Sequence, residues 1–244
     1  MKVNMLCIAK NEDRYIDEWV QYHKKLGIDE FYIYENNWRC NLNYEYINKI
    51  PFDGNAKQIP AYNHYFENYS DKADWVVVID IDEFIVLKKH NNIKELITDY
   101  DNGQVDGIGI NWVLFGDNGL DKVYDDNYSV IDRFTRSGAS PNRHVKVIVK
   151  SIKDLKYKNP HTPEHGLKII DTSHNRIIGP FNCTGITEVA QINHYHTKTK
   201  EEYLAKINRG RATTTKFKNV SNFNPHNQNE VEDLQAFNFY HDIS

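Results

Sequence analysis

The segment Trp75-Val76-Val77-Val78-Ile79-Asp80-Ile81-Asp82-Glu83, residues 75–83, decides the fold that the sequence predicts. Its first five residues are apolar and mostly β-branched, which is typical of a strand buried on both faces of a sheet. Three carboxylates follow where the strand ends, and like charges this close raise one another's pKa unless a cation lies between them. The segment therefore predicts a buried strand ending in a site for a divalent metal. The alternatives are a solvated acidic loop or an acidic helix cap.

Upstream of this segment, the pattern predicts a β-α-β unit. Residues 3–9 and 31–34 are short apolar runs that indicate strands, and apolar residues recur at helical spacing between them. We expect Asn11 to cap this helix and Gly27 to end it. A right-handed crossover makes the two strands parallel, so their carboxyl ends open on one crevice. The polar residues that directly follow the two strands should line this crevice: residues 10–12 and 35–37.

Downstream, the pattern predicts further elements of the same α/β domain. Residues 61–71 and 199–209 resemble helices, and residues 105–115 resemble a strand. Residues 145–150, VKVIVK, alternate in polarity as a half-exposed strand does. We therefore expect one α/β domain with a mostly parallel central sheet flanked by helices.

Composition narrows the classes of function. The chain has 244 residues, 40% of them hydrophobic, which suffices for a sizeable core. Its net charge of −4 provides no general attraction for nucleic acid. The three cysteines are widely spaced, and no apolar run approaches the roughly 20 residues that cross a bilayer. We therefore expect a cytoplasmic protein in a reducing compartment.

A basic stretch lies near the end of the chain. Residues 198–218 carry seven Lys and Arg, whereas residues 219–244 carry four acids and no Lys or Arg. Such a stretch is most often a solvated helix face. The alternative is a surface that faces a phosphate group or gives peripheral contact with the inner face of a membrane.

Several motifs, taken in their order along the chain, resemble the GT-A-fold glycosyltransferases of the family 2 and family 92 type. They are residues 8–12, Glu18-Trp19, Tyr22-His23, Leu26-Gly27, residues 34–36, 74–84, 111–112, 115–116, 144–150 and 193–195, Lys198, and Arg209-Gly210. The resemblance spans residues 3–211. We accordingly expect a GT-A domain over residues 1–211 and an extension over residues 212–244 that packs on it or trails from it.

The resemblance implies transfer of a sugar from a nucleotide-diphosphate donor to an acceptor hydroxyl, with inversion at the anomeric carbon. The expected donor is a UDP-hexose, and the expected acceptor is a glycan or a lipid-linked saccharide. A non-catalytic module that binds a nucleotide sugar or a glycan is one alternative. A metal-dependent nucleotidyltransferase is another, although the sequence has no Gly-rich phosphate loop.

The resemblance also implies a set of metal and diphosphate ligands. Asp80 and Asp82 would hold Mn²⁺ or Mg²⁺ against the diphosphate, with Asp80 also near the ribose. His194 is the expected third ligand, since neutral imidazole binds ions of the Mn²⁺ class, and His196 is a weaker candidate. Lys198 follows closely enough to reach the diphosphate, although it can equally be an ordinary surface lysine.

The nucleoside would lie among polar residues after the first two strands and before the acidic segment. The candidates are Ala9, Lys10, Asn11, Glu12, Glu35, Asn36, Gln58 and Asn63. Carboxylate and amide groups suit a uracil base or ribose hydroxyls. Asn11 and Glu12 have a second explanation, because both residue types also stabilise the start of a helix.

An inverting transfer needs a general base for the acceptor hydroxyl, and the sequence leaves three candidates. Asp117 and Glu164 lie in segments that ordinary turn chemistry also explains. Glu83 is the third, although its place beside the metal favours a supporting role. Aromatic residues near strand ends can shape an acceptor site by stacking on sugar rings. The candidates of this kind are Trp38, Trp112 and Phe115, with core packing as the alternative for Trp112.

Overall fold

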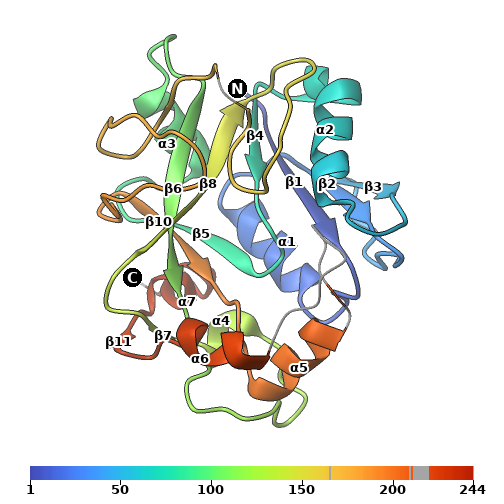
Figure 1. Cartoon of the computed structure of the whole chain (residues 1–244), viewed down its shortest axis with the longest axis vertical. Helices are drawn as coiled ribbons and strands as arrows, with labels where there is room; N and C mark the ends of the chain where they lie inside the picture. The colour runs from blue at the N-terminus through green and yellow to red at the C-terminus, as the bar shows by residue number, and fades with distance from the viewer. Residues whose placement is uncertain (165, 209, 211–219, 244) are drawn as a thin grey trace.

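The computed structural model describes residues 1–164, 166–208, 210 and 220–243. A sheet of nine strands forms the centre of the molecule (Figure 1). In spatial order, its main path is β3 (Ile47–Pro51), β2 (Glu30–Glu35), β1 (Val3–Ala9), β4 (Trp75–Val78), β8 (Asn142–Lys150), β6 (Gly107–Leu114), β10 (Ala190–His194) and β5 (Glu83–Leu87). The short strand β9 (Ile169–Ile170) pairs with β6 beside this path.

The directions of the strands confirm the predicted α/β class and correct one detail of it. Strands β1 to β4 are parallel to one another, so the predicted β-α-β unit is present. However, β8 runs antiparallel to both β4 and β6, and β5 runs antiparallel to β10. The central sheet is therefore mixed.

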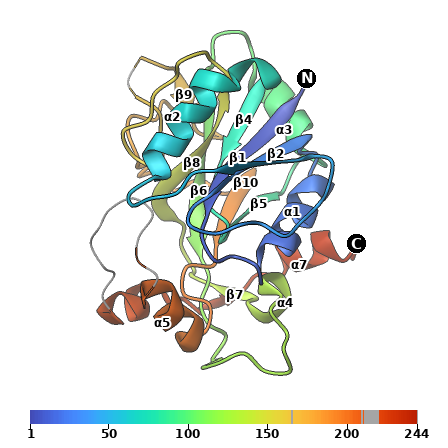
Figure 2. The same ribbon diagram turned by 90° about the vertical axis from the view of Figure 1, so that its right-hand side faces the viewer.

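Helices cover both faces of the sheet (Figure 2). Helix α2 (Gln58–Asn68) lies on one face, and α1 (Ile16–Lys25) and α3 (Ile93–Tyr100) lie on the other. The alternating side chains of β1 explain this arrangement: Met5 packs with the cluster that includes α1, and Leu6 packs with the cluster that includes α2. Both faces of β1 are thus buried, as its continuous apolar run predicts.

The helix ends differ in part from those predicted. Asn11 does not cap α1: the helix begins at Ile16, and Asn11 instead adopts a left-handed conformation with φ 53° where β1 ends. Gly27 does follow the last turn, with φ 103°, a backbone conformation that glycine adopts without strain. Helix α2 begins three residues before the predicted 61, and a short 3₁₀ turn, Ser70–Lys72, follows it.

Strand β8 is not half-exposed, which corrects the prediction from its alternating sequence. Residues 145–149 are all buried, including Lys146, whose side chain is 1% exposed. The reason is that β8 is a central strand: β4 and β6 pair with its two edges, and the core clusters on the two sides of the sheet cover its two faces, with Val147 in one and Ile148 in the other. Lys146 is therefore a charged side chain buried inside the sheet and not one on an exposed face.

The end of the chain packs on the same body. After α4 (Val130–Arg133) and α5 (Lys200–Asn208) come a 3₁₀ turn (Val220–Asn222), α6 (Phe223–His226) and α7 (Gln235–Tyr240). Strand β11 (Val231–Glu232) pairs with β7 (Arg136–Ser137), and the ring of Phe239 lies 5.1 Å from that of Tyr22 in α1. Among the described residues, none of the helices is both long and apolar enough to cross a membrane.

Candidate active site

A cavity of about 380 Å³ lies at the carboxyl ends of β1 and β4. The segment between β4 and β5 forms its floor, and α6 and the end of β10 border it. The predicted site residues that line it are Ala9, Lys10, Glu12, Asn36, Gln58, Asp80, Asp82, His194 and His196. Several residues outside the predicted set also line it: Pro160, His161, Lys206 and His226.

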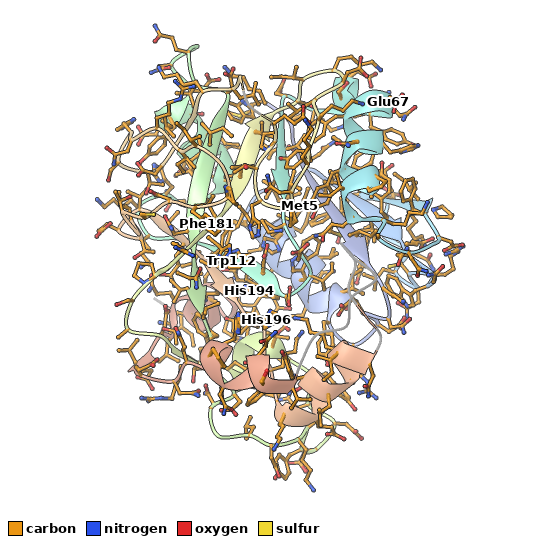
Figure 3. All side chains as sticks on the ribbon, viewed as in Figure 1. Met5, Glu67, Trp112, Phe181, His194 and His196 are labelled. Carbon is orange, nitrogen blue, oxygen red and sulfur yellow. The ribbon has the colours of Figure 1, made fainter. Side chains whose placement is uncertain are left out.

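Strand register brings together residues that are distant in the sequence. In the antiparallel pair of β5 and β10, His194 lies opposite Glu83, and the backbone N–H of Tyr195 donates to the carbonyl of Asp82. Asp82 and His194 thus become neighbours, with 3.6 Å between Oδ2 and Nε2. Figure 3 shows His194 and His196 close together near the centre of the molecule.

Three of these side chains fit a divalent metal. The ligand atoms of Asp82, His194 and His196 all lie within 4.8 Å of one another. Burial lowers the pKa of His194 to about 4, although the Asp82 carboxylate acts to raise it, so the imidazole is neutral and can donate a lone pair. One carboxylate with two imidazoles suits Mn²⁺ better than Mg²⁺, which prefers oxygen ligands.

A lysine that the sequence analysis did not single out faces this cluster. The ammonium of Lys206 in α5 contacts the Oδ2 atom of Asp82 and donates to the backbone carbonyl of His196 at 3.0 Å. Burial alone would raise the pKa of Asp82, but Lys206 and His194 outweigh it and hold that pKa well below its usual range. Asp82 is therefore ionised, as a metal ligand must be.

Asp80 has different partners from Asp82. Its Oδ1 accepts from Gln58 at 2.7 Å, and its Oδ2 accepts from the buried ammonium of Lys146 at 3.0 Å. Lys146 also lies 3.7 Å from Oε2 of Glu83, which is fully buried. Asp80 thus lines the cavity as the end of a buried charge network, and the cluster that could hold a metal among the described residues does not include it.

The other predicted nucleoside contacts separate into two groups. Ala9, Lys10, Glu12 and Asn36 line the cavity at the ends of the first two strands, as the β-α-β interpretation requires, and Gln58 of α2 lines it too. The remaining three, and Lys198, which was expected to reach the diphosphate, lie elsewhere.

Asn11 and Lys198 line a neighbouring cavity instead. Glu35 accepts from the backbone N–H of Cys40, and Asn63 donates to the backbone carbonyl of Tyr157. The side chains of Glu35 and Asn63 are thus engaged with backbone groups outside the cavity lining.

All three predicted general bases lie outside the cavity lining. The Asp117 carboxylate accepts from Asn227 at 2.8 Å and helps to hold the C-terminal segment. Glu164 pairs with Lys158 at 2.7 Å, and Glu83 is buried against Lys146.

Of the aromatic candidates, Trp112 lines the cavity, with its ring 4.2 Å from that of His194. Phe115 is buried in the core, and Trp38 donates to Asp13.

The predicted basic stretch is not a uniform outer surface. Lys198 is buried, Lys206 faces the cavity, and Lys200 is exposed. The other four cations, Arg209, Arg211, Lys216 and Lys218, lie outside the described residues. Of the three cations in the described part of this stretch, Lys198 and Lys206 thus line cavities, where they can meet an anionic ligand.

The fold is that of an α/β protein with a cavity at the carboxyl ends of parallel strands, where proteins of this class bind their ligands. No family model matches the chain. It is similar to a glycosyltransferase family 92 protein of Arabidopsis thaliana, with 23% identity over 229 residues, 85% of this chain and 38% of the relative. A family 92 protein of Ricinus communis is 26% identical over 161 residues, 60% of this chain and 29% of the relative.

These similarities confirm the resemblance to family 92 that the motifs predict. The chain spans about a third of the length of the curated relatives it matches. The solved structure of S. aureus TarS aligns with 62% of this chain and 47% of its own, at 15% identity and a TM-score of 0.35.

Proposed function

We propose that this protein is a metal-dependent glycosyltransferase of the GT-A type, which transfers a hexose from a UDP-sugar to a glycan or lipid-linked acceptor with inversion. The observation that supports it most directly is the cluster of Asp82, His194 and His196 on the wall of a cavity that begins at the end of β1. The similarity to proteins named glycosyltransferase family 92 supports the reaction class. A cytoplasmic location and peripheral contact with a membrane complete the proposal.

Two groups of residues in the cavity would bind the two parts of the donor, its nucleoside and its diphosphate. Ala9, Lys10, Glu12 and Asn36 border the end at β1 and β2, where the nucleoside would lie. Asp82, His194 and His196 would hold the metal at the other end, under the diphosphate. A bound divalent ion supplies charge stabilisation for the departing diphosphate.

Two features of the chain would assist departure of the diphosphate. Lys206, already at Asp82, adds a second cation that an anionic leaving group can contact. Asp80, fixed by Gln58 and Lys146, presents a carboxylate of constant orientation beside the ribose position. Both side chains are part of the cavity wall before any ligand binds, so little reorganisation is required.

The test is release of nucleotide diphosphate from a panel of nucleotide sugars with Mn²⁺ or Mg²⁺. We expect one donor to be hydrolysed, and Asp82→Asn to abolish that hydrolysis while circular dichroism stays unchanged. Asp71→Asn is the matched control, because Asp71 is exposed and lies at the opposite end of β4.

Nuclear magnetic resonance of the first sugar released reports inversion or retention. Tight donor binding without turnover would favour a binding module. Release of pyrophosphate from a nucleoside triphosphate would favour a nucleotidyltransferase.

A further inference from the structure

The position of His161 within the cavity carries an inference about the missing general base. His161 follows Pro160 in a tight turn that the side chain of Asn159 holds. The Oδ1 atom of Asn159 accepts from the backbone N–H groups of His161 and Thr162, at 2.9 and 3.0 Å. Since the ring of His161 also lines the cavity, the turn presents an imidazole to whatever the cavity binds.

The hydrogen bonding of this imidazole determines which nitrogen carries the proton. Nδ1 of His161 lies 3.0 Å from the backbone carbonyl of Val145. A carbonyl oxygen only accepts, so Nδ1 must be the protonated nitrogen, and Nε2 carries a lone pair. Within the described part of the chain, Nε2 has no hydrogen-bond partner and is not enclosed by protein. The ring is therefore held in the tautomer that can accept a proton.

The second observation is that Trp112 contacts both His161 and the metal cluster. The ring of Trp112 contacts both, with its centre 4.2 Å from that of His194 and 5.1 Å from that of His161. In Figure 3, Trp112 follows His194 and His196 in one row, towards Phe181. If the diphosphate lies at the metal cluster, a base for an inverting transfer must stand on the other side of the sugar. We assign His161, which contacts Trp112 and so reaches the metal cluster through that ring, to this side.

A second histidine of the same cavity competes for this role. His226 of α6 also donates from Nδ1 to a backbone carbonyl, that of Asn222, at 2.8 Å. However, its ring lies 4.7 Å from that of His196, which belongs to the metal cluster. His226 therefore stands on the side of the leaving group and makes a suitable comparison for His161.

The surroundings of His161 keep it neutral before the donor binds. Burial lowers its pKa to about 3, and the nearby Lys146 and His144 act in the same direction, whereas Asp80 opposes them. The imidazole thus enters the reaction without a proton. The negative charge of a bound nucleotide diphosphate would raise this pKa and strengthen the base when it is needed.

We propose that His161 is the general base of the transfer, which accepts the proton of the acceptor hydroxyl on Nε2; this inference rests on the proposed function. The acceptor oxygen forms a bond to the anomeric carbon of the sugar as its O–H bond breaks and the proton moves to Nε2. The bond between the anomeric carbon and the β-phosphate oxygen breaks, and its electron pair leaves with the nucleotide diphosphate. The imidazolium then loses its proton to solvent.

The test uses water as the acceptor and the UDP-hexose found by donor hydrolysis. His161→Gln should lower kcat for diphosphate release by about 10²–10⁴-fold. The KM for the donor and the affinity for Mn²⁺, measured by calorimetry, should change less than about threefold. His64→Gln is the matched control, since His64 is a half-buried histidine that packs against Tyr34 and Phe52 outside the cavity.

Chemical rescue separates a base from a residue that only fills space. Added imidazoles should restore turnover to His161→Gly, and the restored rate should rise with the pKa of the imidazole. A restored rate that depends only on the size of the imidazole would overturn the assignment. Rescue of His226→Gly but not of His161→Gly by the added imidazoles would also overturn it. A His161→Gln variant with wild-type kcat would also overturn it, while leaving the proposed function intact. If the wild-type protein released no diphosphate from any donor, the proposed function itself would fail, and the base assignment with it.

Discussion

Replacing the buried Lys146 by methionine is the sharpest test of the charge network under the cavity. The Nζ atom of Lys146 lies 3.0 Å from Asp80 and 3.7 Å from Glu83, and the side chains of Lys146 and Glu83 are 1% and 0% exposed. Methionine keeps the length and apolar volume of the lysine stem but removes its charge. The variant therefore leaves two carboxylates without their shared cation.

The distances set the scale of the expected loss. At an effective dielectric constant of 20, unit charges at 3.0 and 3.7 Å attract by roughly 4–6 kcal/mol each. Much of this attraction offsets the hydration that the ions lose on burial. Removing one partner of a buried pair costs about 3–5 kcal/mol, which we expect for Lys146→Met. Total stabilities are commonly about 5–15 kcal/mol, so the variant should fold with a small margin.

Urea unfolding followed by tryptophan fluorescence measures this loss. The matched control is Lys150→Met on the same strand, where Lys150 forms a partly exposed pair with Asp101 at 3.1 Å, worth at most about 1 kcal/mol. Adding Glu83→Gln to Lys146→Met should recover part of the lost stability. Equal unfolding midpoints for Lys146→Met and Lys150→Met would refute the reasoning.

The dependence of this loss on pH has a definite sign. Burial raises the pKa of Glu83, and Lys146 limits that rise. Without Lys146 the pKa is higher still, so the folded variant binds a proton that the unfolded chain releases above its ordinary glutamate pKa. The protonated form therefore stabilises the variant at low pH, and this gain disappears as the pH rises. The difference in free energy of unfolding between the wild type and Lys146→Met should therefore be smaller at pH 5 than at pH 8.

Two further predictions concern the metal cluster and a second buried ion pair. His196→Ala should weaken Mn²⁺ binding by at least about tenfold in calorimetry, since even a partner that only orients a ligand is worth about 10–100-fold; unchanged affinity would remove His196 from the ligand set. The carboxylate of Glu202 accepts two hydrogen bonds from Arg133 at 2.9 Å, which outweigh burial and lower the pKa of Glu202 to about 2. The wild type should therefore lose stability between about pH 5 and 2, and Glu202→Gln, less stable at pH 7, should show a shallower loss there; parallel urea profiles would contradict this assignment.

The sequence predicts the elements whose signals are local. Strands β1, β2 and β4 are short apolar runs bounded by charged residues, and the structure places strands there. Strand β5 was not predicted, because it begins at Glu83 within an acidic segment that indicates a loop. The antiparallel insertion of β8 was not predicted either, since its alternation of Lys and Val gives no sign of a strand paired on both edges.

Part of the candidate site can be predicted from local sequence signals, whereas the rest depends on how distant strands pair and how distant segments pack. The end of β1 and the acidic segment are recognisable because polar residues directly follow apolar strands. The pairing of Asp82 with His194 depends on the register between β5 and β10, which sequence spacing does not contain. Lys206 and His161 belong to a helix and a turn that only tertiary packing brings to the cavity. Their one sequence signal is a titratable side chain near a predicted strand or helix, which many surface residues share.

The two aspartates that the sequence presents as a pair have separate tasks in the fold. Asp80 and Asp82 belong to one turn between β4 and β5, yet Asp80 is bound by Lys146 of β8, whereas Asp82 faces His194 of β10 and Lys206 of α5. The buried lysine neutralises one carboxylate and so allows the other to remain ionised beside it, because two adjacent uncompensated charges would each raise the pKa of the other. In an acidic pair at a strand end, one carboxylate can thus be a structural partner of a buried cation while the other stays available as a ligand. Here Lys146 pairs with Asp80 and leaves Asp82 for the metal cluster.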